Sequence, residues 1–176
     1  MPLLRNNALV SDTWLHAEAD GDLPKVGDVI VPFARLLKEW DELSQRADRL
    51  GVRFGNTDRP EALAGFLPRL SVILLPFPAF NDGRAYSLAR KLREMGYAGE
   101  LRAIGNVLPD QLQLMLQVGF DTFEIGERFP LETWQKASRL MSLAYQRGLF
   151  RRSSEAEIWT ERHTDAEPWL EQPHAG

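Results

Sequence analysis

Short apolar segments alternate with amphipathic segments along most of this sequence, and this alternation constrains the fold more than any other feature. Runs of apolar residues predict buried strands, while apolar residues three and four positions apart predict helices that bury one face. Strands that alternate with helices favour parallel βαβ units. The sequence therefore predicts a single α/β domain of repeated βα units, with a mainly parallel sheet flanked by helices. An incomplete (β/α) barrel is the alternative, because it is built from the same unit.

The periodicity gives approximate bounds for each element. Strands are expected at residues 28–33, 52–54, 71–77, 101–104 and 122–125, with a weaker one at 14–17. Helices are expected at residues 36–50, 60–67, 83–95, 109–118 and 131–146. The domain is expected to span residues 1–148, followed by a polar tail at 149–176.

Three glycines stand where an expected helix gives way to an apolar residue. They are Gly51, Gly96 and Gly119. Glycine takes a positive φ without the steric penalty of a Cβ atom, so it ends helices well. Each of the three is therefore predicted to lead from a helix into the next strand, which supports the α/β assignment.

Composition limits the classes of function. The chain has 176 residues, and a length of roughly 100–200 residues is usual for one domain. Its 25 acidic and 21 basic residues give a net charge of -4, which argues against general nucleic-acid binding. The sequence contains no cysteine, which excludes disulfides, thiolate catalysis and cysteine-ligated iron–sulfur clusters in this chain.

The sequence carries no sign of export or of membrane insertion. Residues 1–10 lack the basic-then-apolar order of a secretion signal. No apolar run approaches the ~20 residues that a membrane-spanning helix needs. We therefore expect a cytoplasmic protein that does not enter a membrane.

Familiar cofactor motifs are missing from the sequence. It contains no Gly-x-Gly-x-x-Gly fingerprint, no phosphate-binding loop and no Gly-x-Ser-x-Gly elbow. The three histidines, at positions 16, 163 and 174, do not approach metal-ligand spacing. We expect no metal site, and the motifs imply no cofactor.

A binding site is expected where the strands end. In parallel α/β sheets, ligands gather beyond the carboxyl ends of the strands. Four segments that follow expected strands should meet there, at residues 55–59, 79–84, 105–107 and 126–128. The candidate ligand-binding residues in and beside them are Asn81, Asp82, Gly83, Arg84, Tyr86, Ser87, Asn106 and Asp110.

Arg84 is the candidate with the most specific chemistry, an anion site, because it stands in the first turn of an expected helix. Free N–H groups and the positive end of the helix suit an anion there, and a guanidinium would add bidentate contacts. In the alternative interpretation Asp82 caps the helix and Arg84 pairs with a nearby carboxylate. The sequence leaves both open.

Other charged and aromatic residues suggest contact surfaces. Arg90 and Arg93 extend the basic side of the same helix, which is either a solvated face or a docking patch for an acidic partner. The tail is expected to be mobile, with Trp159 and Trp169 as aromatic anchors that dock on this subunit or another, and a tail partly ordered by ordinary packing is the alternative. Arg102 interrupts an apolar strand, so we expect a structural ion pair with Glu100, Asp121 or Glu124.

One dense series of motifs resembles a known family. It begins at residues 77–87 with FPAFNDGRAYS and continues with Gly96-Tyr97, Gly99-Glu100-Leu101-Arg102-Ala103, Gly105-Asn106-Val107, Asp110-Gln111-Leu112 and Gly119-Phe120-Asp121. In that order it resembles a bacterial domain-of-unknown-function family usually encoded beside assimilatory sulfite reductase. The resemblance covers about residues 26–145. The chain departs from the family at Asn106, where members usually have aspartate, and at Gln117, where they have a basic residue.

The resemblance implies a role in sulfite reduction and sulfur assimilation, and members are often labelled as oxidoreductases. Our leading hypothesis is an accessory protein of assimilatory sulfite reduction that binds a protein partner, such as sulfite reductase. The alternative is a small-molecule or anion-binding enzyme with its site at the C-terminal edge of the sheet. A homo-oligomer without a ligand is a third hypothesis.

Overall fold

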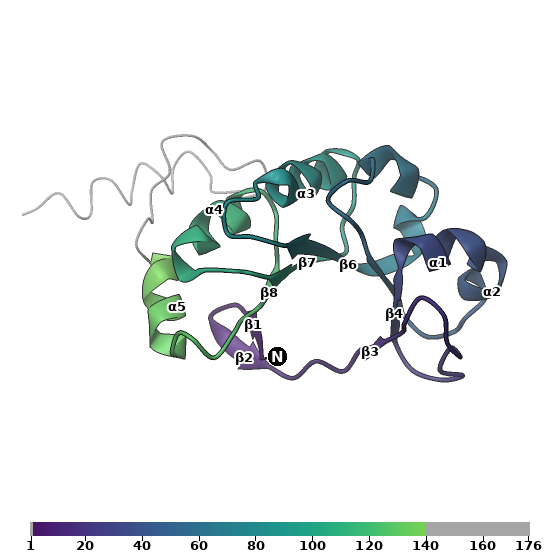
Figure 1. Cartoon of the computed structure of the whole chain (residues 1–176), viewed down its shortest axis with the longest axis horizontal. Coiled ribbons are helices and arrows are strands. Elements are labelled where there is room, and N and C mark those ends of the chain that lie inside the picture. Colours follow the sequence, from purple (N-terminus) through teal and green to yellow (C-terminus); the bar gives the residue numbers. More distant parts are fainter. Residues whose placement is uncertain (1, 140–176) are drawn as a thin grey trace, which may run out of the picture.

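The computed structural model describes residues 2–139, which form one mixed α/β domain around a single curled sheet (Figure 1). Its eight strands are β1 (Leu3–Arg5), β2 (Ala8–Val10), β3 (Leu15–His16), β4 (Val29–Pro32), β5 (Leu50–Arg53), β6 (Leu70–Phe77), β7 (Glu100–Gly105) and β8 (Thr122–Glu124). The helices are α1 (Phe33–Lys38), α2 (Trp40–Ser44), α3 (Arg84–Glu94), α4 (Leu112–Gln117) and α5 (Leu131–Arg139). Three short 3₁₀ turns are η1 (Pro60–Leu63), η2 (Leu67–Arg69) and η3 (Pro109–Gln111).

The sheet is mainly parallel, as predicted, and it curls into a half-barrel. The strands lie in the order β2-β1-β8-β7-β6-β5-β4-β3. All pairs from β3 to β8 are parallel, while β1 pairs antiparallel with both β2 and β8. The helices lie along the outer side of the curl (Figure 1). The alternative of an incomplete barrel therefore fits, with an antiparallel hairpin added at one edge.

Sequence analysis missed this hairpin of β1 and β2. Asn6 and Asn7 join the two strands with φ angles of 48° and 62°. Asparagine tolerates this backbone better than most residues, and two such residues in a row are typical of the tight turn between antiparallel strands. The pair of asparagines between two short, mainly apolar segments, LLR and ALV, was the available signal.

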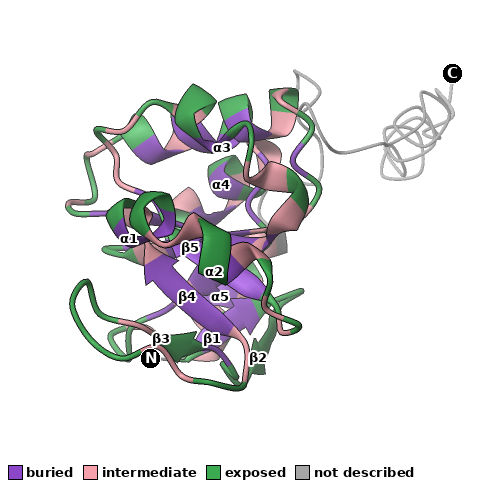
Figure 2. Cartoon of the chain, turned by 90° about the vertical axis from the view of Figure 1, so that its right-hand side faces the viewer, coloured by how far each residue is buried: buried purple, intermediate pink, exposed green. Residues whose placement is uncertain are grey.

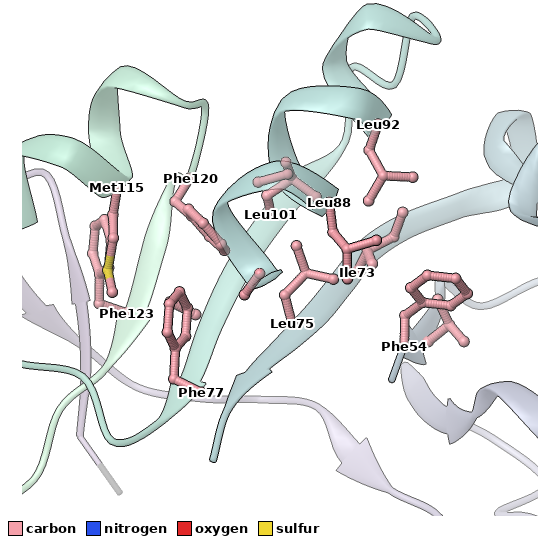
Figure 3. Close-up of a cluster of buried hydrophobic side chains, with 14 of the residues drawn as sticks. Phe54, Ile73, Leu75, Phe77, Leu88, Leu92, Leu101, Met115, Phe120 and Phe123 are labelled. Carbon is pink, nitrogen blue, oxygen red and sulfur yellow. The ribbon is translucent and has the colours of Figure 1, made fainter. Parts of the chain in front are cut away.

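The main core lies between the outer face of the sheet and the helices. Leu75 and Phe77 of β6, Leu88 and Leu92 of α3, and Phe120 point into it (Figure 3). These side chains are buried. Figure 2 shows burial also along strand β4, whereas the edge strands β2 and β3 are exposed. The nearly continuous apolar run of β6 and the three- and four-residue spacing of buried residues in α3 explain why this strand and helix were predicted closely.

A smaller core lies on the inner face of the curl. Trp14 packs there with Ile30, Val72 and Leu74. Trp14 belongs to the connection between β2 and β3, which are the two opposite edges of the sheet. We call residues 11–14 the N-terminal strap, since this connection must cross the open side of the half-barrel (Figure 1).

Two of the three predicted helix stops are confirmed. Gly96 has a φ of 89°, and the N–H groups of Gly96 and Tyr97 donate to the carbonyls of Arg93 and Leu92 at 2.9 and 3.0 Å. Gly119 has a φ of 104°, and α4 ends with the same pair of bonds. These nested bonds satisfy the last free carbonyls of each helix.

The third stop was wrong. Gly51 lies inside β5, with buried residues on both sides. A Cβ atom there would meet Val72 Cγ1 and would lie 2.8 Å from Ile30 Cγ1. Gly51 is therefore required by close packing of strands β4, β5 and β6 on the inner face.

Two expected helices are shorter than predicted. The helix expected at 36–50 is split into α1 and α2 at Glu39, which has a φ of -114°, and it ends at Ser44. The helix expected at 60–67 consists of the 3₁₀ turns η1 and η2. Pro60 and Pro68 each stand in the first positions of such a turn, where the missing N–H of proline is tolerated but a continuous α-helix is not.

Some predictions concern residues outside the described part. These are residues 140–146 of the last expected helix, the tail at 149–176, and Trp159 and Trp169 within it. Among residues 2–139, no helix combines the length and the apolar character that crossing a bilayer requires.

Candidate functional site

The carboxyl ends of the parallel strands meet at one edge of the sheet, which we call the rim. The loops that follow β5, β6 and β7 contact one another there through side-chain hydrogen bonds. The segment at 126–128 follows β8, which runs parallel to β7 and so ends at the same edge. The predicted gathering of loops at the rim is thus observed.

The centre of the rim is the loop at residues 78–84, which we call the motif loop. Amide groups from three places hold it. Asn106 Nδ2 donates to the carbonyl oxygen of Pro78 at 2.6 Å, and Gln111 Nε2 donates to that of Phe80 at 2.6 Å. Asn56 Nδ2 lies 3.4 Å from Asp82 Oδ2. These contacts, together with a bond from Asp82 N–H to the carbonyl of Ala79 at 3.0 Å, fix the path of the loop.

The tip of the motif loop is apolar and exposed. Phe80 has 63% of its surface accessible to solvent, although its backbone carbonyl is bound by Gln111. Asn81 beside it is also exposed. The loop therefore presents an aromatic side chain on a backbone that neighbouring segments hold in place.

Asp82 and Arg84 pair with each other at the start of α3. Arg84 Nε and Nη2 donate to Asp82 Oδ1 and Oδ2 at 2.9 and 2.7 Å, and the backbone N–H of Arg84 donates to Oδ1 at 3.1 Å. These bonds from the Arg84 side chain and backbone hold the pKa of Asp82 well below its usual range. The same pairing raises the pKa of Arg84. The sequence suggested an anion site at the Arg84 guanidinium, but in the structure this group is bound by the carboxylate of Asp82.

Tyr86 and Asp110 lie near each other beside the motif loop. The ring of Tyr86 packs edge-on against Phe77, with centroids 5.3 Å apart. Partial burial raises the pKa of the Tyr86 hydroxyl, and the negative charge of Asp110 raises it further. Asp110 is exposed in η3, and Ser87 is exposed on α3. Tyr86 is therefore anchored by its ring and is neutral at ordinary pH.

Asn106 holds the rim by its backbone as well as by its side chain. Its N–H donates to the carbonyl of Phe77 at 2.8 Å. The preceding Gly105 has a φ of 91°, and a Cβ atom there would lie 2.7 Å from the same carbonyl oxygen. A side chain at position 105 would force the exits of β6 and β7 apart, so this close approach depends on glycine.

Arg90 and Arg93, which were predicted together, have different surroundings. Arg90 is exposed and pairs with Glu94 at 3.0 Å. Arg93 is largely buried and donates to the carbonyls of Tyr97, Gly99 and Gly119, and to the carboxylate of Asp121 at 2.6 Å. Arg93 therefore ties the ends of α3 and α4 together.

The predicted ion pair between Arg102 and Glu100 is confirmed. Arg102 Nη2 lies 2.9 Å from Glu100 Oε1, and Arg102 is buried. Its second carboxylate was missed: Arg102 Nη1 donates to Asp12 Oδ2 at 2.8 Å. Asp12 lies in the N-terminal strap, so only the fold brings the two residues together.

Asn56 and Gln111 are the rim residues that sequence analysis did not single out. One amide oxygen of each, Asn56 Oδ1 and Gln111 Oε1, is buried and has no hydrogen-bond partner among the described residues. Gln111 lies in the Asp110-Gln111-Leu112 motif and could have been selected on that ground. Asn56 had only its place in a loop beyond an expected strand as a signal.

Within residues 2–139, no group of three or more histidine or acidic side chains is placed to hold a metal ion. The rim therefore offers amide, carboxylate and aromatic groups for recognition. Its chemistry in the described part rests on hydrogen bonds and on the exposed ring of Phe80.

Comparison with protein families gives one match. Residues 51–155 match the family described as bacterial protein of unknown function (DUF934). This span includes β6 to β8, all but the first residue of β5, and the whole motif loop. Comparisons with curated proteins and with solved structures found no match. Since the family model covers more than half of the sequence, the chain belongs to the bacterial family of unknown function DUF934.

Proposed function

We propose that this chain is an accessory protein of assimilatory sulfite reduction that binds a protein partner through the motif loop. The observation that carries the proposal is the exposure of Phe80, at 63%, on a loop held by Asn56, Asn106 and Gln111. Aromatic residues dominate the energetics of many protein interfaces. An exposed aromatic side chain at the centre of a polar rim is suited to that role.

The way the loop is held also supports binding. Ordering a loop at an interface opposes association, so a loop that is already fixed binds with a smaller entropic cost. The three amide side chains come from the segments after β5 and β7 and from η3, and all hold the motif loop from outside it. The loop can therefore meet a partner without first being ordered.

The resemblance of the motif series to a family encoded beside assimilatory sulfite reductase suggests the partner. Sulfite reductase carries the redox groups of that reaction, whereas this sequence has no cysteine to hold an iron–sulfur cluster. An accessory role needs no redox group in this chain, whereas electron transfer to sulfite would need one. In this proposal Phe80 and Asn81 contact sulfite reductase directly.

The test uses the full chain and purified assimilatory sulfite reductase in a calorimetric or interferometric binding assay. Phe80→Ala is expected to weaken binding by roughly tenfold or more, the effect of losing an interface anchor worth about 1.4 kcal/mol or more. Val26→Ala is the matched control, because Val26 is an exposed apolar residue before β4, at the opposite edge of the sheet, with 76% exposure.

If Phe80→Ala and Val26→Ala bind sulfite reductase equally well, Phe80 is not part of the interface. If the unaltered chain neither binds sulfite reductase nor changes its rate of sulfite reduction, the proposed partner is wrong. The first comparison needs a folded Phe80→Ala chain, which we expect because the side chain of Phe80 is exposed.

A small-molecule or anion-binding enzyme with its site at the rim is the second candidate. The observation that favours it is the pair of buried amide oxygens of Asn56 and Gln111, which lack partners among the described residues. Neither oxygen is accessible to solvent, so a ligand would bond to them only after the side chains that cover them move. An anion at Arg84 would have to compete with the carboxylate of Asp82, so a ligand rich in donors suits this rim better.

This candidate is tested by thermal unfolding of the full chain with sulfite, sulfate, flavins, nicotinamides and phosphorylated metabolites. A ligand present at a hundred times its dissociation constant adds about 2.7 kcal/mol of stability, which a melting curve resolves. The chain with Asn56→Ala and Gln111→Ala should lose that stabilisation. No shift with any of these compounds would count against this second candidate and leave the protein-binding proposal intact.

A further inference from the structure

A groove lies at the end of the domain away from the rim, between the C-terminal ends of α3 and α4. Its volume is about 680 Å³, and its lining is mixed. Leu4, Leu112, Phe120 and Phe123 form a buried apolar floor, Leu116 is exposed, and polar residues such as Gln113 and Gln117 complete the lining. A smaller hollow of about 340 Å³ adjoins it and shares Leu116, Phe120 and Asp121 with it. We call the two together the α3–α4 groove. Leu116 is 41% exposed on its wall.

The groove holds one carboxylate just after α4, that of Asp121, and the carbonyl ends of two helices, beside the amides of Asn6, Asn7, Gln113 and Gln117, which both donate and accept. Helices α3 and α4 both end there, so their carbonyl ends face this side of the domain. Asp121 accepts bonds from Arg93 and from the N–H of Leu101 at one oxygen, Oδ2. The walls contain two cations, and both are already paired. Arg93 donates to three carbonyls and to Asp121, and Arg5 pairs with Glu100 at 2.7 Å. The groove is thus suited to an apolar segment that brings its own basic groups.

The sequence supplies such a segment directly after the groove wall. Ser138 lines the groove, and the chain continues from it through residues 140–152. This stretch carries apolar residues together with arginines, and no acidic residue occurs between Glu132 and Glu155. Its larger apolar and basic residues include Met141, Tyr145, Phe150, Arg147, Arg151 and Arg152.

The extent of the family match shows that the segment at residues 140–152 belongs to the family together with the domain. The match ends at residue 155, so it includes the basic and apolar segment and stops where the acidic residues of the tail begin. The segment is thus shared by the family together with the domain, whereas most of the acidic tail is not.

From these observations we propose that residues 140–152 of the same chain occupy the α3–α4 groove. The apolar side chains would cover Leu116 and its neighbours, and the arginines would face Asp121 and the ends of α3 and α4. Because the segment starts at the wall of the groove, its effective concentration there is on the order of millimolar or more, which favours the same chain over a separate partner. This inference does not depend on the proposed function, since the groove and the motif loop lie at opposite ends of the domain.

The test exploits the lack of cysteine in the sequence. Leu116→Cys is combined in turn with Met141→Cys, Tyr145→Cys and Phe150→Cys, and each full chain is oxidised at low concentration. Disulfides form only when the Cα atoms approach within about 7 Å, so at least one pair should link within the monomer. The control is Leu114→Cys in the same three combinations, because Leu114 is 51% exposed on α4 but does not line the groove.

A second measurement needs only single substitutions. Leu116→Cys should react with a maleimide at least about tenfold more slowly than Leu114→Cys, although the two side chains are similarly exposed in the described domain. Unfolding of each reduced variant shows whether the domain is folded.

Each result decides the proposal. Links within the monomer at position 116, absent at 114, support it. Links between two chains would show that the segment of a second copy fills the groove and would overturn the proposal. Equal linking or equal maleimide rates at 114 and 116 would overturn it as well.

Discussion

The side-chain amide of Asn106 lies 2.6 Å from the carbonyl oxygen of Pro78, and the backbone N–H of Asn106 donates to the preceding carbonyl, that of Phe77, at 2.8 Å. One residue after β7 thus binds two successive carbonyl groups where β6 ends. The motif loop leaves the sheet at this point. Its direction therefore depends on a neighbouring strand as well as on its own sequence.

Asn106→Asp should destabilise the protein, because an ionised carboxylate cannot donate to the carbonyl of Pro78. Losing this exposed bond and facing the carbonyl with a negative charge should lower the free energy of unfolding by roughly 0.5–1.5 kcal/mol. Urea denaturation at neutral pH measures the change. Asn81→Asp is the control, since Asn81 is exposed and its amide has no hydrogen bond among the described residues. Equal stability of the two variants would mean that the bond from Asn106 does not hold the loop.

Arg93→Lys should lower the stability of the fold far more than Arg90→Lys does. The guanidinium of Arg93 reaches the carbonyls of Tyr97, Gly99 and Gly119 at once, which a single ammonium group cannot do. We expect Arg93→Lys to lower the free energy of unfolding by roughly 2–4 kcal/mol. Arg90→Lys should change it by less than about 0.5 kcal/mol, because Arg90 is exposed. Chemical denaturation of both variants checks the difference, and similar midpoints would refute it.

Asp12→Asn should alter how stability depends on pH. Burial opposes ionisation of Asp12, but the N–H of Trp14 and the charge of Arg102 outweigh it and lower the pKa of Asp12 below its ordinary value of 3.8. A carboxyl whose pKa is lowered by folding stabilises the protein above its unfolded pKa and loses that effect as the pH falls through the folded pKa. At pH 7 the variant should therefore be less stable by roughly 1–3 kcal/mol.

The same reasoning predicts that the stabilities of the unaltered chain and Asp12→Asn converge as the pH falls below about 4. The amide that replaces the carboxyl in this variant does not titrate, so its contribution stays constant. Denaturation curves at several pH values between neutrality and acid give the comparison. A gap that is constant over this range would show that the ion pair between the N-terminal strap and Arg102 contributes nothing.

Gly51→Ala should destabilise the sheet, although alanine is only one methyl group larger. The added Cβ atom would meet Val72 Cγ1 and would lie 2.8 Å from Ile30 Cγ1, and such overpacking costs roughly 1–3 kcal/mol. Gly65→Ala is the matched control, because nothing lies within 4 Å of its added Cβ atom. There the reduced entropy of the unfolded chain should stabilise by up to about 1 kcal/mol. Thermal or urea unfolding of the two variants should therefore move in opposite directions.

Much of the fold was predictable because its signals are local. The apolar spacing of α3, the glycine stop at Gly96 and the apolar run of β6 each lie within a few residues. The presence of a glycine was equally visible at position 51, but its role was not. Whether a glycine ends a helix or allows two side chains to pack across it depends on neighbours that the sequence places far away.

Local patterns in the amino-acid sequence were enough to predict that apolar strands alternate with helices, that the loops after them gather at one edge, and that Arg102 needs a carboxylate. The three-dimensional structure was needed to see that the sheet curls, that Asp12 from the N-terminal strap supplies a second carboxylate to Arg102, and that Arg84 is bound by Asp82. The difference lies in the range of the interactions. Propensity and burial act over one or two turns of chain, whereas Asp12 and Arg102 are 90 residues apart, and their contact forms only when the N-terminal strap crosses between the edge strands β2 and β3.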